Sequence, residues 1–231
     1  MDTLFYAPIE DFEDNHWVEL KGQEAQHISK VLRKQVGSEI RVANGRGEIY
    51  FCEITEINRH LVVAKCGTST TKPEPSFKKT LAFGAIKKRD RLEFAIEKAV
   101  ELGVWEICLF NSDHTERPKI NRDRLHTLIV SAFKQSGRYW LPELVILDSM
   151  DEVLEHYKGA GWIMAHEKAD STSKAGKLTK KNNVLFVGPE GGFSEREVEL
   201  IKKRKGEIVS LGVNRLRAET AVTALLSQYL F

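Results

Sequence analysis

Two short segments of the chain carry residues that could hold a small ligand. The first, VGPEGGFS, follows an apolar run and contains Gly188, Pro189, Glu190, Gly191 and Gly192. Glycine allows positive φ and leaves room for a ligand beside the backbone, while proline fixes one torsion. The spacing matches neither a P-loop nor the GxGxxG of a dinucleotide-binding fold. The segment therefore predicts either an ordinary strand-to-helix turn or a turn that binds a ligand through its backbone.

The second segment, NRLRAET, follows another apolar run that ends at Leu211 and Gly212. Backbone groups and an apolar wall for a flat heterocycle are expected from Leu211, Gly212 and Leu216. Charge and hydrogen-bonding groups are expected at its edge from Arg217, Glu219 and Thr220. Ligands of open α/β sheets bind outside the carboxyl ends of the strands, so both segments are expected to face one crevice.

Alternating strands and helices are predicted to position these segments. Strands are expected at 81–86, 104–110, 143–147, 162–166, 184–188 and 208–211. Helices are expected at 91–102, at 122–135, after the capping boxes Ser149/Glu152 and Ser194/Glu197, and after Thr220. This alternation is typical of an α/β fold with a parallel sheet. The last helix is too apolar to stand alone, which leaves core packing, or core packing plus a subunit interface, as its role.

The chain before this region has a different pattern. Short β-rich pieces at 38–43, 48–54 and 60–66, separated by turn signals such as NGRG, predict a small barrel or curled sheet with one helix around 24–34. A linker is expected at 68–79, which is polar and carries two prolines. The expected domains are therefore 1–70 and 75–231. The polar stretch 167–183 predicts a flexible insertion or a flap over a site, of which the insertion is favoured.

Composition restricts the class of protein. The 231 residues are 42% hydrophobic, which is enough for a substantial core. No run approaches the roughly 18 apolar residues of a membrane span, and residues 1–15 lack the features of a signal peptide. A soluble, cytoplasmic protein without a membrane partner is expected. The three cysteines, Cys52, Cys66 and Cys108, are scattered, so they predict buried small side chains rather than a disulfide framework or metal site.

Positive charge is concentrated in two runs. Six Lys or Arg residues stand against two acidic residues between Lys21 and Arg46, and four more cations lie within 87–91. A single run of this kind is usually a solvated face. Two runs in separate predicted domains favour a polyanionic partner.

Five blocks of sequence resemble a known family, the RsmE group of SPOUT-class RNA methyltransferases. The blocks are VGPEGGFSEREVE, LGVNRLRAETA, KKRDRLEFAIEKAVELGV, KQSGRYWLPEL and HISKVLRKQVGSEI. The resemblance implies methylation of N3 of a uridine in 16S ribosomal RNA of the small subunit. It also implies an N-terminal PUA-like RNA-binding β-barrel and a C-terminal α/β domain whose last segment threads a trefoil knot, a rare exception to unknotted topology.

The resemblance also assigns roles to residues. S-adenosyl-L-methionine, with S-adenosyl-L-homocysteine as product and without a metal, would lie in the pocket formed by His166, Gly188, Pro189, Glu190, Gly191, Gly192, Leu211, Gly212, Leu216 and Thr220. The candidate catalytic residues are Arg217, Arg138 and Glu219. The candidate RNA contacts are His27, Arg33, Lys34, Lys88, Arg89 and Arg91. Arg217 and Arg138 can each instead pair with a phosphate or with a structural carboxylate. Glu219 can instead cap its helix, and His27 and His166 can be structural.

The function and the form of the substrate each remain open from the sequence. A ribose 2′-O methyltransferase of the same fold and a non-catalytic RNA-binding assembly factor are rival functions. Naked ribosomal RNA and the assembled 30S subunit are rival substrates. The family also implies a homodimer through the C-terminal domain, and the large apolar residues Tyr229, Leu230 and Phe231 at the terminus favour burial against a partner. In such a dimer Arg138 of one subunit is expected beside the pocket of the other.

Overall fold

The computed structural model describes residues 3–14, 16–116, 118–170, 173, 176–178 and 180–230. The chain forms two compact units. The first comprises Met1–Glu74 with Phe133–Leu141, and the second comprises Pro75–Ala132 with Pro142–Phe231. Phe231, which was expected to be buried against a partner together with Tyr229 and Leu230, lies outside the described residues, as does part of the predicted insertion at 167–183. No helix in these ranges combines the length and the apolar character needed to cross a membrane.

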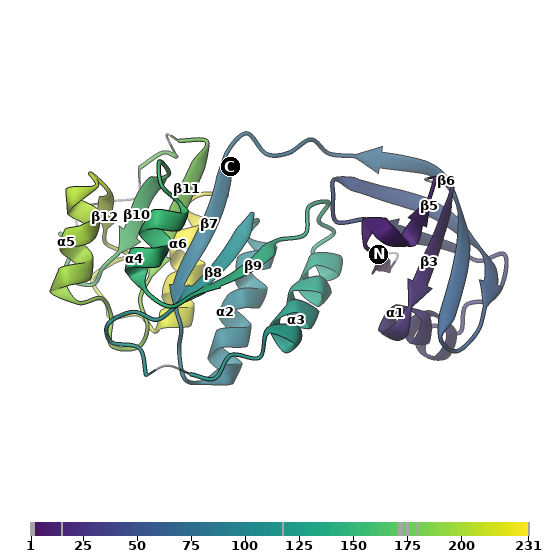
Figure 1. Ribbon diagram of the computed structural model, residues 1–231, viewed down its shortest axis with the longest axis horizontal. Coiled ribbons are helices and arrows are strands. Elements are labelled where there is room, and N and C mark those ends of the chain that lie inside the picture. Colours follow the sequence, from purple (N-terminus) through teal and green to yellow (C-terminus); the bar gives the residue numbers. More distant parts are fainter. Residues whose placement is uncertain are drawn as a thin grey trace. The chain divides into compact units, whose positions relative to one another are not determined.

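The first unit is built on a curled six-stranded sheet (Figure 1). Its strands are β1 (Leu4–Tyr6), β2 (Phe12–Glu13), β3 (Trp17–Lys21), β4 (Glu39–Ala43), β5 (Glu48–Ile57) and β6 (Leu61–Thr71). They lie in the order β1-β4-β5-β6-β3-β2, and only the β1–β4 pair is parallel. Short helical segments are η1 (Ile9–Asp11), α1 (Gly22–Gln26) and η2 (His27–Val31). The predicted barrel-type sheet is confirmed, and the predicted helix at 24–34 corresponds to α1 and η2.

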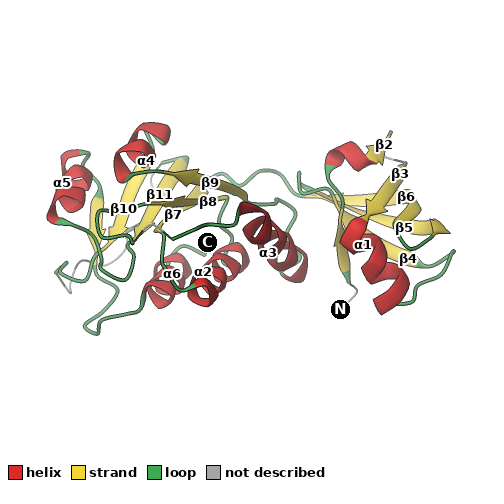
Figure 2. Ribbon diagram, turned by 60° about the horizontal axis from the view of Figure 1, so that its bottom comes forward, coloured by secondary structure: helices red, strands yellow, loops and turns green. Residues whose placement is uncertain are grey.

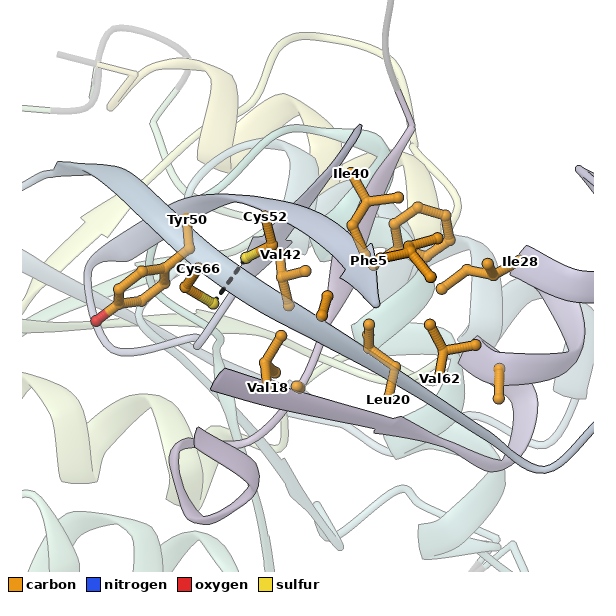
Figure 3. Close-up of a cluster of buried hydrophobic side chains, with 14 residues drawn as sticks. Phe5, Val18, Leu20, Ile28, Ile40, Val42, Tyr50, Cys52, Val62 and Cys66 are labelled. Atoms are coloured by element: carbon orange, nitrogen blue, oxygen red, sulfur yellow. Dashed lines mark hydrogen bonds between the residues drawn. The ribbon is translucent and has the colours of Figure 1, made fainter. Parts of the chain in front are cut away.

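Alternating apolar residues of these strands form the core of the first unit (Figure 3). Val18 and Leu20 of β3 point inward, as do Ile40 and Val42 of β4, because side chains alternate between the two faces of a strand. The three cysteines are free and buried, as the sequence predicts.

The second unit contains a six-stranded sheet whose strand pairs are all parallel. Its strands, in the order β12-β10-β11-β7-β8-β9, are β7 (Lys78–Gly84), β8 (Glu106–Phe110), β9 (Glu143–Leu147), β10 (Gly161–Ala165), β11 (Asn182–Val187) and β12 (Glu207–Val209). The helices are α2 (Arg89–Glu101), α3 (Arg122–Gln135), α4 (Met150–His156), α5 (Glu195–Lys203) and α6 (Ala218–Ser227). Figure 2 shows α4 and α5 on one face of the sheet and α2 and α6 on the other. The predicted α/β fold is confirmed, whereas the trefoil knot stays a prediction.

Local signals set the helix ends of the second unit. Ser149 accepts a hydrogen bond from the Glu152 amide at the start of α4, and Ser194 with Glu197 forms a complete capping box at the start of α5. α6 begins at Ala218, three residues before the sequence predicts. The predicted linker is shorter than expected, because 68–71 continue β6 and Thr71 pairs with Glu48 of β5. Threonine suits a strand, so the polar character of these residues was a misleading linker signal.

The first unit includes a segment from the middle of the sequence. Phe133–Leu141 comprises the end of α3 and the loop that follows it. The Gly47 amide donates to the Tyr139 carbonyl (2.9 Å), and Trp140 Nε1 donates to the Lys72 carbonyl (3.0 Å). Gly47 has φ +99°, and a Cβ on it would lie 2.6 Å from Cζ2 of Trp140. These contacts join residues that are far apart in the sequence. Because no local pattern indicates such contacts, the sequence predicted two contiguous domains.

Candidate active site

A cavity of about 310 Å³ lies where strands of the second unit end. Residues that follow the carboxyl ends of β10, β11 and β12 line it, as expected for a ligand site in an open α/β sheet. The lining comprises Arg91, Ala165, His166, Glu167, Val187, Gly188, Pro189, Glu190, Gly192, Phe193, Leu211, Gly212, Asn214, Arg215, Leu216, Arg217, Ala218 and Ala221. The two segments singled out in the sequence therefore face one cavity.

The turn after β11 is tightly folded. The Gly192 amide donates to the Pro189 carbonyl (2.9 Å), and Gly192 has φ +69°, a conformation that favours glycine. A Cβ on Gly188 would lie 3.1 Å from the carbonyl carbon of Gly192. Gly188 and Gly192 thus let the turn close on itself and present its backbone to the cavity.

Gly84, the last residue of β7, also shapes this turn. A Cβ on Gly84 would lie 2.6 Å from Cδ and 2.9 Å from the nitrogen of Pro189. β7 pairs with β11 up to Phe83 and Val187, so the strand carries Gly84 directly against the turn. Gly84 was not among the residues predicted for the site. Its signal was a glycine at the end of an apolar strand, which often marks a close backbone approach.

The loop after β12 forms the other side of the cavity. Gly212 has φ +128°, and its amide donates to Oγ of Ser210 (3.3 Å). Nε of Arg215 lies 3.2 Å from Oε2 of Glu167, which joins this loop to the end of β10. Burial lowers the pKa of the neighbouring His166, so its ring is neutral near pH 7.

Two arginines of the cavity, Arg91 and Arg217, come from α2 and from the start of α6. Nε of Arg91 lies 3.5 Å from Oε1 of Glu219, which is buried in the first turn of α6. Arg217 is the N-cap residue of α6, and its side chain makes no capping hydrogen bond there. Arg91, which the sequence predicted as an RNA contact, is part of the cavity lining, and its contact with RNA stays a prediction. A cation next to a buried carboxylate and a second arginine can stabilise negative charge that develops on a bound base.

Four predicted site residues are not part of the cavity lining, namely Gly191, Thr220, Arg138 and Glu219, the last of which contacts the lining residue Arg91. A Cβ on Gly191 would lie 2.9 Å from Cβ of His114, so packing against His114 is what requires glycine there. Thr220 is exposed on α6. Arg138 belongs to the first unit, and burial lowers the pKa of its guanidinium to about 10.

The other predicted RNA contacts have different surroundings. His27 packs edge-on against the buried ring of Phe5, with 5.9 Å between ring centroids, which is a structural role. Nζ of Lys34 donates to the Glu39 carbonyl (2.9 Å). Arg33, Lys88 and Arg89 are exposed. The exposed cations are thus available to an anionic partner, and the RNA contact of the half-buried His27 stays a prediction.

Two family models match the chain. The model described as RNA methyltransferase domain matches residues 72–230, and the one described as RNA methyltransferase PUA domain matches residues 20–65. A protein from Rickettsia conorii named ribosomal RNA small subunit methyltransferase E is 30% identical, over 93% of this chain and 90% of its own length. A protein of the same name from Bacillus subtilis is 26% identical, over 90% of this chain and 87% of its own length.

Solved structures resemble the whole chain. A ribosomal RNA small subunit methyltransferase E from Neisseria gonorrhoeae, bound to S-adenosyl methionine, has a TM-score of 0.84 at 27% identity and covers 99% of this chain and 96% of its own. A probable rRNA methyltransferase from Porphyromonas gingivalis has a TM-score of 0.84 at 31% identity. The match covers 98% of this chain and 96% of the Porphyromonas gingivalis chain.

Proposed function

Because the chain belongs to the ribosomal RNA small subunit methyltransferase E family, we propose that it transfers a methyl group from S-adenosylmethionine to N3 of a uridine in 16S ribosomal RNA. The observation that carries this proposal is the cavity at the strand ends, where the turn 188–192 and the loop 211–217 meet. A barrel that binds RNA, placed at residues 1–70 by the sequence, completes the proposed enzyme.

The residues of the cavity fit S-adenosylmethionine. The volume of about 310 Å³ is at the lower end of the range for small-molecule sites. Gly188 and Gly192 leave backbone groups accessible to an adenine ring, and Leu211, Leu216 and Phe193 supply apolar walls. Glu167 and Glu190 lie in the lining and carry the charge that suits an ammonium group. Bound S-adenosylmethionine would supply an electrophilic methyl group on a sulfonium.

The arginines of the cavity are assigned to the methyl acceptor. N3 of uracil carries a weakly acidic proton. Its loss to the solvent leaves an imide anion, whose lone pair on N3 then takes the methyl group. Arg217 stabilises this anion in the proposed mechanism. Arg91, held by Glu219 at 3.5 Å, adds a second cation to the same cavity. In this arrangement Glu219 orients Arg91. Glu219 also lies in the first turn of α6, where a negative charge stabilises the helix.

Nucleoside analysis tests the proposed reaction. Small-subunit RNA and intact small subunits from a strain lacking the gene are incubated separately with the protein and S-adenosylmethionine, then digested for mass spectrometry. We expect one new 3-methyluridine in at least one of the two substrates. Appearance of 2′-O-methyluridine instead would contradict the assignment to N3, and absence of methylation in both would contradict an enzymatic role.

The exposed Arg33 and the neighbouring, half-buried Lys34 of the first unit are proposed to contact RNA phosphates. Replacing Arg33 and Lys34 with glutamine should weaken RNA binding and reduce the slope of log affinity against log salt by about 2, since each phosphate contact contributes about 0.9. Filter binding at several salt concentrations measures the slope. Affinity for S-adenosylmethionine is expected to stay unchanged. A slope equal to that of the wild type would assign both residues to a solvated face.

The enzyme is further proposed to be a homodimer through its second unit, with Arg138 acting in the partner's site. Analytical ultracentrifugation should give a mass near twice 26.3 kDa. Mixed Arg138→Ala and Gly84→Ala subunits should recover part of the activity that each variant lacks alone, and Arg138→Lys serves as a folding control. A monomeric mass with full activity would contradict the dimer. A dimer without recovery would contradict only the shared site.

A further inference from the structure

Glu197 is a completely buried carboxylate on α5 that lies outside the cavity. Oε2 accepts hydrogen bonds from the Ser194 amide (2.9 Å) and from Oγ of Ser112 (2.9 Å), and Oε1 accepts one from the Asp113 amide (3.1 Å). Only the first of these bonds is part of the helix cap. The other two join α5 to the loop that follows β8, more than 80 residues earlier in the sequence.

The loop after β8 is held to the same helix at a second place. Asp113 accepts hydrogen bonds from Nε (3.0 Å) and Nη2 (2.9 Å) of Arg196 and from Oγ of Ser194 (2.5 Å). The guanidinium of Arg196 lowers the pKa of Asp113. The loop is closed by two bonds between Ser112 and Thr115, from amide to hydroxyl (2.9 Å) and from amide to carbonyl (2.8 Å). These hydrogen bonds fix the conformation of the loop and hold it against α5.

This loop reaches the turn that lines the cavity. Nδ1 of His114 lies 3.1 Å from the carbonyl oxygen of Gly191, and Cβ of His114 fills the space beside Gly191. On the other side, the amide bound by Glu197 belongs to Ser194, which directly follows the cavity residues Gly192 and Phe193. Glu197 thus bonds both the loop that supports the turn and the residue where the turn ends.

We propose that Glu197 is a positioning residue for the S-adenosylmethionine site, and that it acts by fixing the Ser112–Thr115 loop and Ser194 around the 188–193 turn. This inference rests on the proposed function of the cavity. A carboxylate suits this task because both of its oxygens are acceptors, so it accepts all three hydrogen bonds at once. A glutamine has only one acceptor oxygen, and it therefore cannot accept from both the Ser194 amide and the Asp113 amide, which bond different oxygens of Glu197. The N-terminus of α5 also favours a negative charge at this position.

The test compares three variants. Glu197→Gln removes one acceptor, and Ser112→Ala removes one donor without changing the helix cap. Glu152→Gln is the matched control, because Glu152 occupies the same capping position on α4 and accepts only from the Asp148 amide outside that cap. Hydrogen exchange of the segment 188–194 is measured without ligand, and S-adenosylmethionine affinity is measured by calorimetry.

We expect faster exchange at 188–194 and about tenfold weaker S-adenosylmethionine binding in Glu197→Gln and Ser112→Ala, because hydrogen bonds to a charged group are the stronger ones. The Glu152→Gln control should match the wild type in both measurements. Unchanged exchange and affinity in folded Glu197→Gln and Ser112→Ala proteins would overturn the inference and leave Glu197 a helix cap. If the wild type binds no S-adenosylmethionine, the proposed function fails, and the exchange comparison still decides whether Glu197 positions the turn.

Discussion

A Gly84→Ala protein is expected to bind S-adenosylmethionine about tenfold to a hundredfold more weakly than the wild type. The added methyl group would lie 2.6 Å from Cδ and 2.9 Å from the nitrogen of Pro189, so the turn must move. The strands give little room for adjustment, since β7 and β11 are paired from Lys78 and Asn182 to Phe83 and Val187. Overpacking of this kind costs about 1–3 kcal/mol, and the displaced Pro189 lines the cavity.

Gly67→Ala is the matched control for this change. Gly67 is also a strand glycine, but a Cβ there would meet only the Phe51 carbonyl, at an ordinary 3.5 Å. Calorimetry on both variants, with thermal unfolding to verify folding, separates a local effect from a general one. Wild-type affinity in a folded Gly84→Ala protein would contradict the assignment of the 188–192 turn to the cofactor.

An Arg217→Ala protein is expected to lose about a hundredfold to a thousandfold in kcat while it retains S-adenosylmethionine affinity within a few-fold. Removal of one group that stabilises a developing anion has effects of this size. Helix α6 should persist, because the Arg217 side chain makes no capping bond. Single-turnover methylation of small-subunit RNA measures the rate, and calorimetry measures the affinity.

Two further variants test whether the loss of kcat is specific to the charge of Arg217. Arg204→Ala removes an arginine whose Nη1 bonds only the Leu200 carbonyl of its own helix, so it should leave kcat unchanged. Arg217→Lys retains the charge and should recover part of the rate. An Arg217→Ala protein with wild-type kcat, or one that loses cofactor affinity as strongly as kcat, would remove Arg217 from the role assigned to it.

Local signals account for the parts of the fold that the sequence predicts well. The apolar stripe of 122–135 coincides with α3, and the Ser194/Glu197 pair begins α5 as its spacing indicates. Apolar runs place the strands, and the rule for strand ends brings the 188–192 turn and the 211–216 loop to one cavity. These features depend on neighbours within a few residues, which a single sequence contains.

The features that the sequence did not reveal depend on distant partners. Gly84 is required by Pro189, and the second role of Glu197 requires Ser112 and Asp113. Arg91 looked like one more cation in a basic run, and only the position of α2 beside α6 brings it to Glu219. Strand pairing and helix packing create these contacts, and no local pattern identifies the distant partner in any of them.

The location of the bound cofactor tests the central claim most directly. Hydrogen exchange of the wild-type protein is measured with and without saturating S-adenosylmethionine, and the difference is mapped along the chain. The account predicts protection at 165–167, 188–193 and 211–218, three segments that line the cavity, with little change in β3 to β6 of the first unit. Protection confined to other segments, or none in a folded protein at saturating ligand, would contradict it.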